Sequence, residues 1–578
     1  MRRRDRLAGM LGMLFPLLAC VGARRPTSPP AIAAPTSAAF EAIAERILDH
    51  QLEAHPQRGV ELGLHGYDGR LPDVSPTGMI ALQRQLHDDI AALGRVDDAR
   101  TGLATVEFAA LLNALLTDRF ELEVQRSPWR NPMYYLGALD LTPYISRDYA
   151  PLETRAAAIA KIAAASVEYL AHAQARLEPR LPRTFLDTAL LQTRGSASFV
   201  RKDVATALAG LGDTALMHRC TTALAAMAAA LDRYADHLEG LRPNATDDFA
   251  LGQEIFAQML RETQGLDVDL GRLRGLLQAD LDRNLAALDA AAAEIDPSAS
   301  TAVVVARVAQ SKSGDVLALA TQQSATLRAF LLSADLLTIP SDELVHVVES
   351  PPFLRWNAAF LSPSGPFERG GLPSFYYISP PDPSWPVQAQ RDYLPGVHDL
   401  LFITIHEVWP GHFAHALHLR RNPSRVLKST WNYTTAEGWA HYAEEMMWEA
   451  GVDPDPRAHV GQLLNALLRD VRALSALGLH TEGWDVERSR HMFVEHGFQD
   501  EASAAQQAVR GTFDPMYLAY TVGKLVIRKL RDDVAARRGA GFSLREFHDE
   551  LLSHGAAPLG AIRRAMLGES SGDASPLL

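Results

Sequence analysis

Apolar residues recur along most of this chain at the three- and four-residue spacing that is typical of amphipathic helices. The first such stripe begins with Phe40, Ile43 and Ile47. Alanine and leucine dominate the later stretches 155–177, 205–241, 270–295 and 302–332. Alanine is the best helix former, and small side chains let helices approach one another closely. The pattern predicts a mainly α protein, a large multi-helix body around a central cleft.

Residues 350–386 break this pattern, because prolines and glycines are too frequent there for a long helix. Within them, residues 374–379 read Ser-Phe-Tyr-Tyr-Ile-Ser, which favours a short strand. We expect a small β element near the metal site described below, with an edge that could bind an extended peptide. Tyr376 and Tyr377 are then candidates to support the metal site or to contact substrate. A packed aromatic loop is the alternative.

The N-terminus has the features of a bacterial export signal. Three arginines at positions 2–4 precede an apolar run over residues 7–19, which is too short to span a bilayer. Leu-Leu-Ala-Cys at 17–20 resembles the lipobox of lipoproteins, in which the cysteine is lipidated; an ordinary signal peptide is the alternative. We expect a protein of the bacterial envelope or periplasm that touches the membrane only through a lipid on Cys20.

The domain limits follow from these patterns. We expect a signal peptide over residues 1–20 and a flexible tether over 21–38, where proline and serine are frequent. A single helical domain would occupy 39–567. The glycine- and serine-rich tail 568–578 is expected to be disordered.

Composition narrows the classes of function. Hydrophobic residues make up 47% of the 578 residues, enough for a substantial core, and the net charge is −13. This charge argues against a nucleic-acid partner or an anionic lipid surface. Cys20 and Cys220 are the two cysteines, too few for a disulfide framework or a cysteine-rich zinc site. Cys220 lies in an alanine-rich stretch and is expected to be buried.

The segment His-Glu-Val-Trp-Pro-Gly-His at 406–412 carries the most specific chemistry in the sequence. Two imidazoles and a later carboxylate can bind one Zn²⁺ ion and leave a coordination position for water. Glu407, next to the first imidazole, could accept a proton from that water. These residue types point to hydrolysis, and we expect peptide bonds as the substrate.

The spacing of the two histidines does not fit a regular helix. His406 and His412 are six residues apart, so an ideal helix would place them about 240° apart around its axis. Pro410 and Gly411 lie between them and can break or bulge a helix. We therefore predict a distorted helix at 409–411. The distortion would place His406 and His412 on one face, as in a regular helix with histidines four residues apart.

The third ligand is expected from a second helix. Asn-Pro-Ser at 422–424 would end the first helix, and Thr434 and Thr435 are candidate N-caps for the next. Glu437 is the expected ligand on that helix. His441 and Glu444 share its face and are candidates to support a ligand by hydrogen bonding or to face the substrate.

These motifs resemble a known family. His-Glu-x-x-Pro-Gly-His, the later Glu-Gly-Trp-Ala-x-Tyr-Ala-Glu at 437–444 and Tyr-x-x-Gly-Lys at 520–524 are similar to the bacterial DUF885 family. That family is distantly similar to helical zinc metallopeptidases of the oligopeptidase and thermostable-carboxypeptidase type. The resemblance covers residues from about 40 to 567 and is strongest over 400–531. His441 and Phe413 depart from it, since an apolar residue and a second histidine are more usual at these positions.

The resemblance implies functional roles for particular residues. It implies that His406, His412 and Glu437 bind zinc and that Glu407 is the catalytic base. It also suggests that the phenol of Tyr520 stabilises the oxyanion, although a purely structural role in the core is the alternative. We therefore expect an exported zinc metallopeptidase that cleaves short peptides. A metal-dependent hydrolase of other amides or esters and a noncatalytic envelope protein are the alternatives.

Overall fold

The computed structural model describes residues 38–96, 103–351, 354–355, 358–381, 383–568 and 577–578. The predicted signal peptide with Cys20, the tether up to residue 37 and tail residues 569–576 lie outside the described residues. Helices follow one another from Ala38 to Leu567, interrupted by one small sheet. The prediction of a mainly α fold is confirmed.

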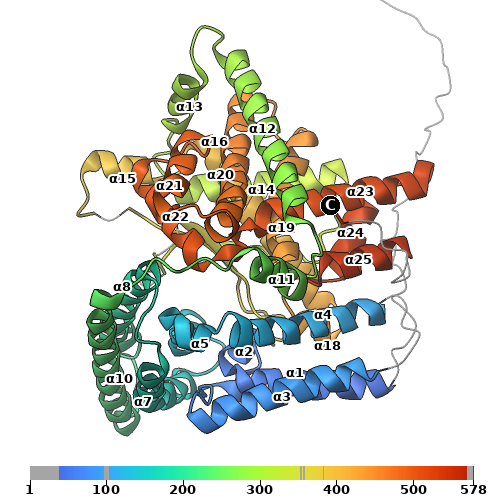
Figure 1. Ribbon diagram of the computed structural model, residues 1–578. Coiled ribbons are helices and arrows are strands. Elements are labelled where there is room, and N and C mark those ends of the chain that lie inside the picture. The colour runs from blue at the N-terminus through green and yellow to red at the C-terminus, as the bar shows by residue number, and fades with distance from the viewer. Residues whose placement is uncertain (1–37, 97–102, 352–353, 356–357, 382, 569–576) are drawn as a thin grey trace, which may run out of the picture.

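The helices of residues 38–241 form one half of the helical body, drawn in blue to green in the lower part of Figure 1. Helix α10 packs along α7 and α8, and α3 packs on α1 and α4. Cys220 on α10 is buried, as predicted. The helices are α1 (Ala38–Ala54), α2 (Pro56–Glu61), α3 (Pro76–Gly94), α4 (Leu103–Arg119), α5 (Ser127–Arg130), α6 (Thr142–Ser146), α7 (Leu152–Arg176), α8 (Arg183–Phe199), α9 (Ala205–Ala207) and α10 (Thr214–Leu241).

The remaining helices lie mostly above these in Figure 1 and include those that carry the predicted site. They are α11 (Gln253–Gln264), α12 (Leu270–Ile295), α13 (Thr301–Ala309), α14 (Val316–Ala334), α15 (Val387–Tyr393), α16 (Val397–Glu407), α17 (His412–Arg421), α18 (Arg425–Ser429), α19 (Tyr433–Glu449), α20 (Pro456–Thr481), α21 (Val486–Glu495), α22 (Glu501–Phe513), α23 (Ala519–Arg538), α24 (Leu544–Ser553) and α25 (Leu559–Leu567). Helix α19 packs along α23, and α20 packs along both α12 and α16.

Short polar side chains fix where many helices begin. Their oxygens accept a hydrogen bond from a backbone N–H of the first turn, which has no partner within the helix. The residues that do this in the C-terminal half are Asp269, Asp315, Ser424, Asn432, Asp455, Asp485, Asp500 and Ser543. The N-cap of α19 is therefore Asn432, and the prediction of Thr434 or Thr435 is wrong. Both threonines are buried in the first turn, where Asn432 accepts from the backbone N–H of Thr435.

The small sheet lies where the loop-rich segment predicts it. Strands β1 (His346–Glu349), β2 (Ala359–Ser362) and β3 (Phe375–Ile378) are arranged in the order β1-β3-β2. The predicted strand is thus present as β3. The prediction that it offers an edge is wrong, because β3 pairs with β1 on one side and with β2 on the other.

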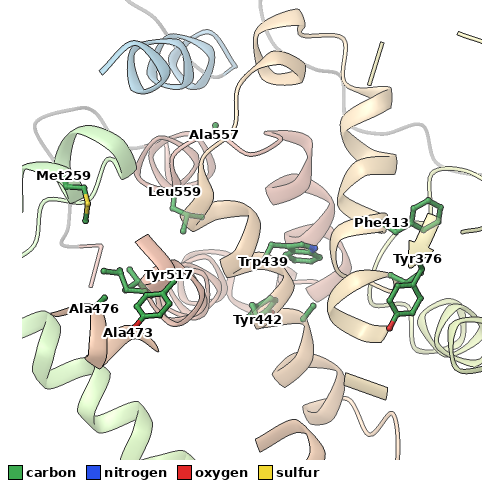
Figure 2. Close-up of a cluster of buried hydrophobic side chains, with 14 of the residues drawn as sticks. Met259, Tyr376, Phe413, Trp439, Tyr442, Ala473, Ala476, Tyr517, Ala557 and Leu559 are labelled. Carbon is green, nitrogen blue, oxygen red and sulfur yellow. The ribbon is translucent and has the colours of Figure 1, made fainter. Parts of the chain in front are cut away.

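Buried apolar side chains connect these elements into a continuous core. Figure 2 shows part of it, with Met259 of α11, Tyr376 of β3, Trp439 of α19 and Leu559 of α25 among the labelled residues. None of the helices in the part of the chain that the structure describes is both long and apolar enough to cross a membrane.

Helices α19 and α23 approach each other most closely at two glycines. A Cβ atom on Gly438 would overlap the Cα atom of Gly523, and a Cβ on Gly523 would overlap the carbonyl oxygen of Thr434. Only glycine leaves room for backbones at this distance. The crossing fixes Glu437, which precedes Gly438, against the turn of α23 that contains Tyr520.

We predict that Gly438→Ala lowers the free energy of unfolding by about 1–3 kcal/mol, because backbone atoms must move to admit the added methyl group. Gly275→Ala is the matched control, since Gly275 is an exposed helical glycine with open space at its Cβ position. That control should leave stability unchanged or raise it by about 0.5–1 kcal/mol. Denaturant unfolding monitored by circular dichroism measures both, and equal effects of the two substitutions would refute the close crossing.

Candidate metal centre

The chain between the two motif histidines forms a widened helical turn. Helix α16 ends at Glu407 and α17 begins at His412. The N–H of Gly411 donates to the carbonyl of Ile405 (3.0 Å), and the N–H of Ala414 donates to that of Val408 (3.2 Å). Both bonds span six residues, where a regular α-helix spans four. The predicted distortion at 409–411 is confirmed.

Pro410 and Gly411 fit this turn for separate reasons. Proline has no N–H to leave without a partner. A Cβ on Gly411 would overlap the carbonyl oxygen of His406, so no other residue type fits there. The carbonyl of Pro410 accepts a hydrogen bond from the indole Nε1–H of Trp439 (3.0 Å), which holds the turn against α19. The two sequence motifs are therefore in direct contact.

The widened turn brings the three predicted ligands together. The Nε2 atoms of His406 and His412 each lie 3.4 Å from Oε2 of Glu437. One nitrogen or oxygen atom from each of the three residues lies within 4.8 Å of the other two. Among the described residues, this is the one group of histidine, cysteine or acidic side chains with such geometry. The side chains of His412 and Glu437 remain 17% and 13% exposed, so the cluster is open to solvent.

A buried carboxylate orients the first imidazole. His406 Nδ1 lies 2.7 Å from Oε1 of Glu444, which has no exposed surface. A carboxylate can only accept, so Nδ1–H donates to it and Nε2 faces Glu437. Arg469 of α20 pairs with the same Glu444 oxygen at 3.1 Å. This support of a ligand by an ionised carboxylate is typical of metal-binding histidines.

The electrostatics of the cluster favour a bound cation. Burial alone would lower the pKa of His406, but the close contact with the Glu437 carboxylate and the hydrogen bond with Glu444 outweigh it and raise the pKa to about 9. Burial would also raise the pKa of Glu437, yet the positive field of His412 and the contacts with His406 hold this pKa below its usual value. The two pKa shifts have one cause. The imidazole and carboxylate groups lie so close together that a proton on the imidazole is stabilised by the negative charge beside it.

The three side chains fit a divalent metal ion. Oε2 of Glu437 is buried and has no hydrogen-bond partner among the described residues. Buried polar atoms are almost always paired, so this oxygen indicates a ligand. Two neutral imidazole nitrogens and one carboxylate oxygen are the donor set of catalytic zinc sites that keep a position for water.

His441 lies behind this cluster and does not belong to it. Its ring is fully buried, and Nδ1 is 3.5 Å from Oε1 of Glu444. Burial and the nearby ammonium of Lys524 lower the pKa of His441 to about 3, so the ring is neutral at physiological pH. His441 therefore lies next to the residue that supports His406.

Glu407 lies between the metal ligands and the sheet. Its Oε2 accepts a hydrogen bond from the backbone N–H of Leu361 on β2 (2.8 Å). This N–H is on the outer edge of the sheet, because the other side of β2 pairs with β3. The edge strand next to the site is thus β2.

The two tyrosines of β3 are buried. The hydroxyl of Tyr376 lies 3.3 Å from that of Thr404 on α16, and its ring has no exposed surface. Tyr377 packs against Phe360 and Phe375. The structure places Tyr376 and Tyr377 in the support of α16 and the sheet, which is one of their two predicted roles, and contact with substrate stays a prediction.

Tyr520 lies beside the first ligand. Its ring stacks near that of His406, with centroids 6.0 Å apart and an interplanar angle of 23°. The hydroxyl of Tyr433 lies 3.4 Å from that of Tyr520. Burial and the negative charge of Glu437 raise the pKa of Tyr520, so its phenol keeps its proton and can donate a hydrogen bond. Tyr520 is largely buried, and the contact of its ring with that of His406 places it beside the cluster.

Sequence reasoning missed the arginines of α20 and the tyrosine at the start of α19. Arg469 supports Glu444, Arg472 lies over the ring of Tyr520, and Tyr433 contacts its hydroxyl. One signal was available: Arg469 and Asp470 interrupt a helix whose surrounding residues are mostly apolar, which indicates buried charges.

Comparisons with known proteins agree with this architecture. A family model described as "Bacterial protein of unknown function (DUF885)" matches residues 56–566. No curated protein sequence matches the chain. A solved structure titled as a "putative lipoprotein of unknown function" from Shewanella oneidensis is similar with a TM-score of 0.77 and 21% identity, covering 93% of this chain and all of that one. A second, titled as the "putative lipoprotein" from Colwellia psychrerythraea, has a TM-score of 0.75 and 17% identity over 92% of this chain and 99% of its own.

The raised pKa of His406 predicts how the stability of the metal-free protein depends on pH. The folded pKa of about 9 exceeds the ordinary value of 6.5, so protonated His406 stabilises the fold fully below about pH 6.5. This contribution, on the order of 3 kcal/mol, is lost as the pH rises through 9. The difference in unfolding free energy between the wild type and His406→Gln should therefore shrink between about pH 6 and pH 9.5.

Chemical denaturation of protein stripped of metal measures this difference. Glu444→Gln is the informative control, because it removes one of the two carboxylates that raise the pKa of His406. In that background the loss should occur at lower pH. A difference between wild type and His406→Gln that is independent of pH would show that the imidazole is not held by these carboxylates.

Proposed function

The chain belongs to the DUF885 family of bacterial proteins, and we propose that it is an exported zinc-dependent peptidase that hydrolyses short peptides. One observation carries the proposal: two imidazole nitrogens converge on a buried carboxylate oxygen of Glu437 that has no hydrogen-bond partner in the described part of the chain. Zn²⁺ bound there would lower the pKa of a water molecule and polarise the scissile carbonyl.

The side chains around the cluster supply the other parts of a hydrolytic reaction. Glu407 accepts a proton from the attacking water and delivers it to the amine nitrogen as the C–N bond breaks. The phenol of Tyr520 donates a hydrogen bond to the carbonyl oxygen as that oxygen gains negative charge. Glu444 and Arg469 keep the imidazole of His406 in one tautomer and one orientation throughout.

The proposed location rests on the sequence and on the relatives. Leu-Leu-Ala-Cys at 17–20 has the lipobox pattern, and the titles of both similar structures describe putative lipoproteins. We place the protein in the bacterial envelope, with a lipid on Cys20 and the helical body reached through the tether.

Glu407→Gln tests the proposed base. We expect the variant to keep zinc and its unfolding temperature, because Glu407 is not in the ligand cluster. Its kcat on short peptides should fall by about a hundred- to ten-thousandfold. Glu437→Gln should lose zinc as well as activity. Glu449→Gln is the matched control for Glu437→Gln. Glu449 lies on α19, as Glu437 does, but pairs with Arg531 away from the cluster.

Metal analysis and peptide cleavage monitored by mass spectrometry measure these effects. Chelation should abolish cleavage by the wild type, and added zinc should restore it. Cleavage that survives chelation, or full activity of Glu407→Gln, would contradict the proposal. Cleavage of small esters or amides but of no peptide would assign the same site to another substrate.

Tyr520→Phe tests the proposed oxyanion donor. Removing the hydroxyl should lower kcat by about a hundred- to a thousandfold while zinc content and KM change little. Tyr517→Phe is the matched control one turn earlier, where the buried hydroxyl donates to Ser475 (2.9 Å). That control should lower stability and leave kcat unchanged. Equal kcat for Tyr520→Phe and the wild type would remove Tyr520 from the reaction.

A further inference from the structure

Three arginines surround the pair of tyrosines beside the metal cluster. The guanidinium carbons of Arg469 and Arg472, both on α20, lie 5.7 Å and 5.4 Å from the centre of the Tyr520 ring. Arg510 of α22 approaches the other tyrosine, with its Nη2 3.4 Å from the hydroxyl of Tyr433. This gathering of positive charge lies next to the position where a substrate would bind.

Two of these arginines already have a carboxylate partner. Arg469 pairs with Glu444 at 3.1 Å. Arg510 pairs with Asp514, with nitrogen–oxygen distances of 2.8 and 2.9 Å. Their charges are therefore balanced within the protein, and neither is available to bind an anion without breaking an ion pair.

Arg472 differs from both. Its Nε–H donates to the side-chain oxygen of Gln507 on α22 (2.9 Å). Within the residues that the structure describes, Arg472 forms no ion pair with a carboxylate and its terminal nitrogens make no hydrogen bond. Those nitrogens are also not enclosed, since they are not among the buried polar atoms that lack a partner.

A cation in this setting favours an anionic ligand. Burial and the positive charges of Arg510 and Arg469 lower the pKa of Arg472, but a guanidinium remains charged in proteins. A partly desolvated charge without a counter-ion is unfavourable. Because Gln507 holds Nε, the terminal N–H groups are oriented as a fork, which matches the two oxygens of a carboxylate.

We propose that Arg472 binds a carboxylate of the substrate and makes the site selective for peptides that carry one close to the scissile bond. The inference rests on the proposed peptidase function and specifies its substrate class. The carboxylate can be the free C-terminus of a short peptide or an acidic side chain, since both offer the same pair of oxygens.

The distances set how close that carboxylate lies to the reacting bond. Arg472 contacts the ring of Tyr520, and the ring of Tyr520 contacts that of His406 at 6.0 Å between centroids. An extended chain spans about 3.3–3.6 Å per residue, so the guanidinium lies no more than roughly three residues from the metal ligand. The carboxylate is therefore at or near the end of a short peptide, or on a residue near the cleaved bond.

Cleavage of matched peptides by the zinc-loaded protein tests the proposal. The substrates are penta-alanine with a free C-terminus, its C-terminal amide, and two amidated analogues with aspartate or asparagine at the centre. The wild type should prefer the charged member of one pair by about ten- to a hundredfold in kcat/KM, mostly through KM. The preferred pair identifies the source of the carboxylate.

Arg472→Gln should remove that preference, because kcat/KM falls far more for the charged peptides than for the uncharged ones. Arg472→Lys should restore part of it, because a lysine keeps the charge but not the fork. Arg457→Gln is the matched control on the same helix, where the side chain is half exposed and pairs with Asp455. No preference in the wild type, or an equal loss on charged and uncharged peptides in Arg472→Gln, overturns the proposal.

A binding measurement separates this inference from the proposed function. Calorimetry with zinc-loaded Glu407→Gln compares penta-alanine with its amide, with and without Arg472→Gln. Tighter binding of the free acid that is lost with Arg472→Gln supports the inference even if the wild type cleaves no peptide, an outcome that would refute the peptidase function alone. Equal affinity for acid and amide, together with equal affinity for the aspartate and asparagine analogues, overturns the inference.

Discussion

The widened turn between α16 and α17 is the constraint on which the candidate site depends. In a regular helix, His412 would lie about 240° around the axis from His406, and no single ion could contact both. Two backbone hydrogen bonds that span six residues take the extra residues into one widened turn. The imidazole centroids therefore lie 4.8 Å from each other. The turn is held from outside by Trp439, so its shape belongs to the packing of α19 as much as to its own sequence.

Helix α19 buries three carboxylates whose surroundings differ in one decisive respect. Glu445 faces Lys524 and Arg283, and Glu444 faces Arg469. Among the described residues, the ion-pair contacts of Glu437 are with the two histidines, whose charge depends on protonation. A buried carboxylate without a permanent cation is costly, so Glu437 is the position where an added cation gains most. The charges around these carboxylates thus point to Glu437 and its two histidines, the same cluster that the distances identify.

Local rules explain what the sequence could predict. Helix periodicity, the helix break at Pro410 and Gly411, the end of α17 before Asn422 and a third ligand on the next helix all depend on residues near one another in the chain. The order of the strands does not, because nothing local shows that β3 pairs on both sides. The same holds for Arg469 and Arg472, which reach the site only because α20 packs along α16. Asn432 was missed as the N-cap because three of the four residues 432–435 can cap a helix.

Three motif segments that are far apart in the sequence form one contact set, which explains why their residue types occur together. Trp439 binds the turn of the first motif, and Gly438 of the second meets Gly523 of the third. Tyr520 precedes that glycine by one turn, so the depth of the crossing sets its distance from His406. Lys524, next to Gly523, lies 2.6 Å from Asp280 on α12 and fixes α23 from the opposite direction. A larger residue at either glycine would separate the helices and move the phenol away from the ligands. The small residues of the second and third motifs are therefore as necessary to the proposed chemistry as the side chains that perform it.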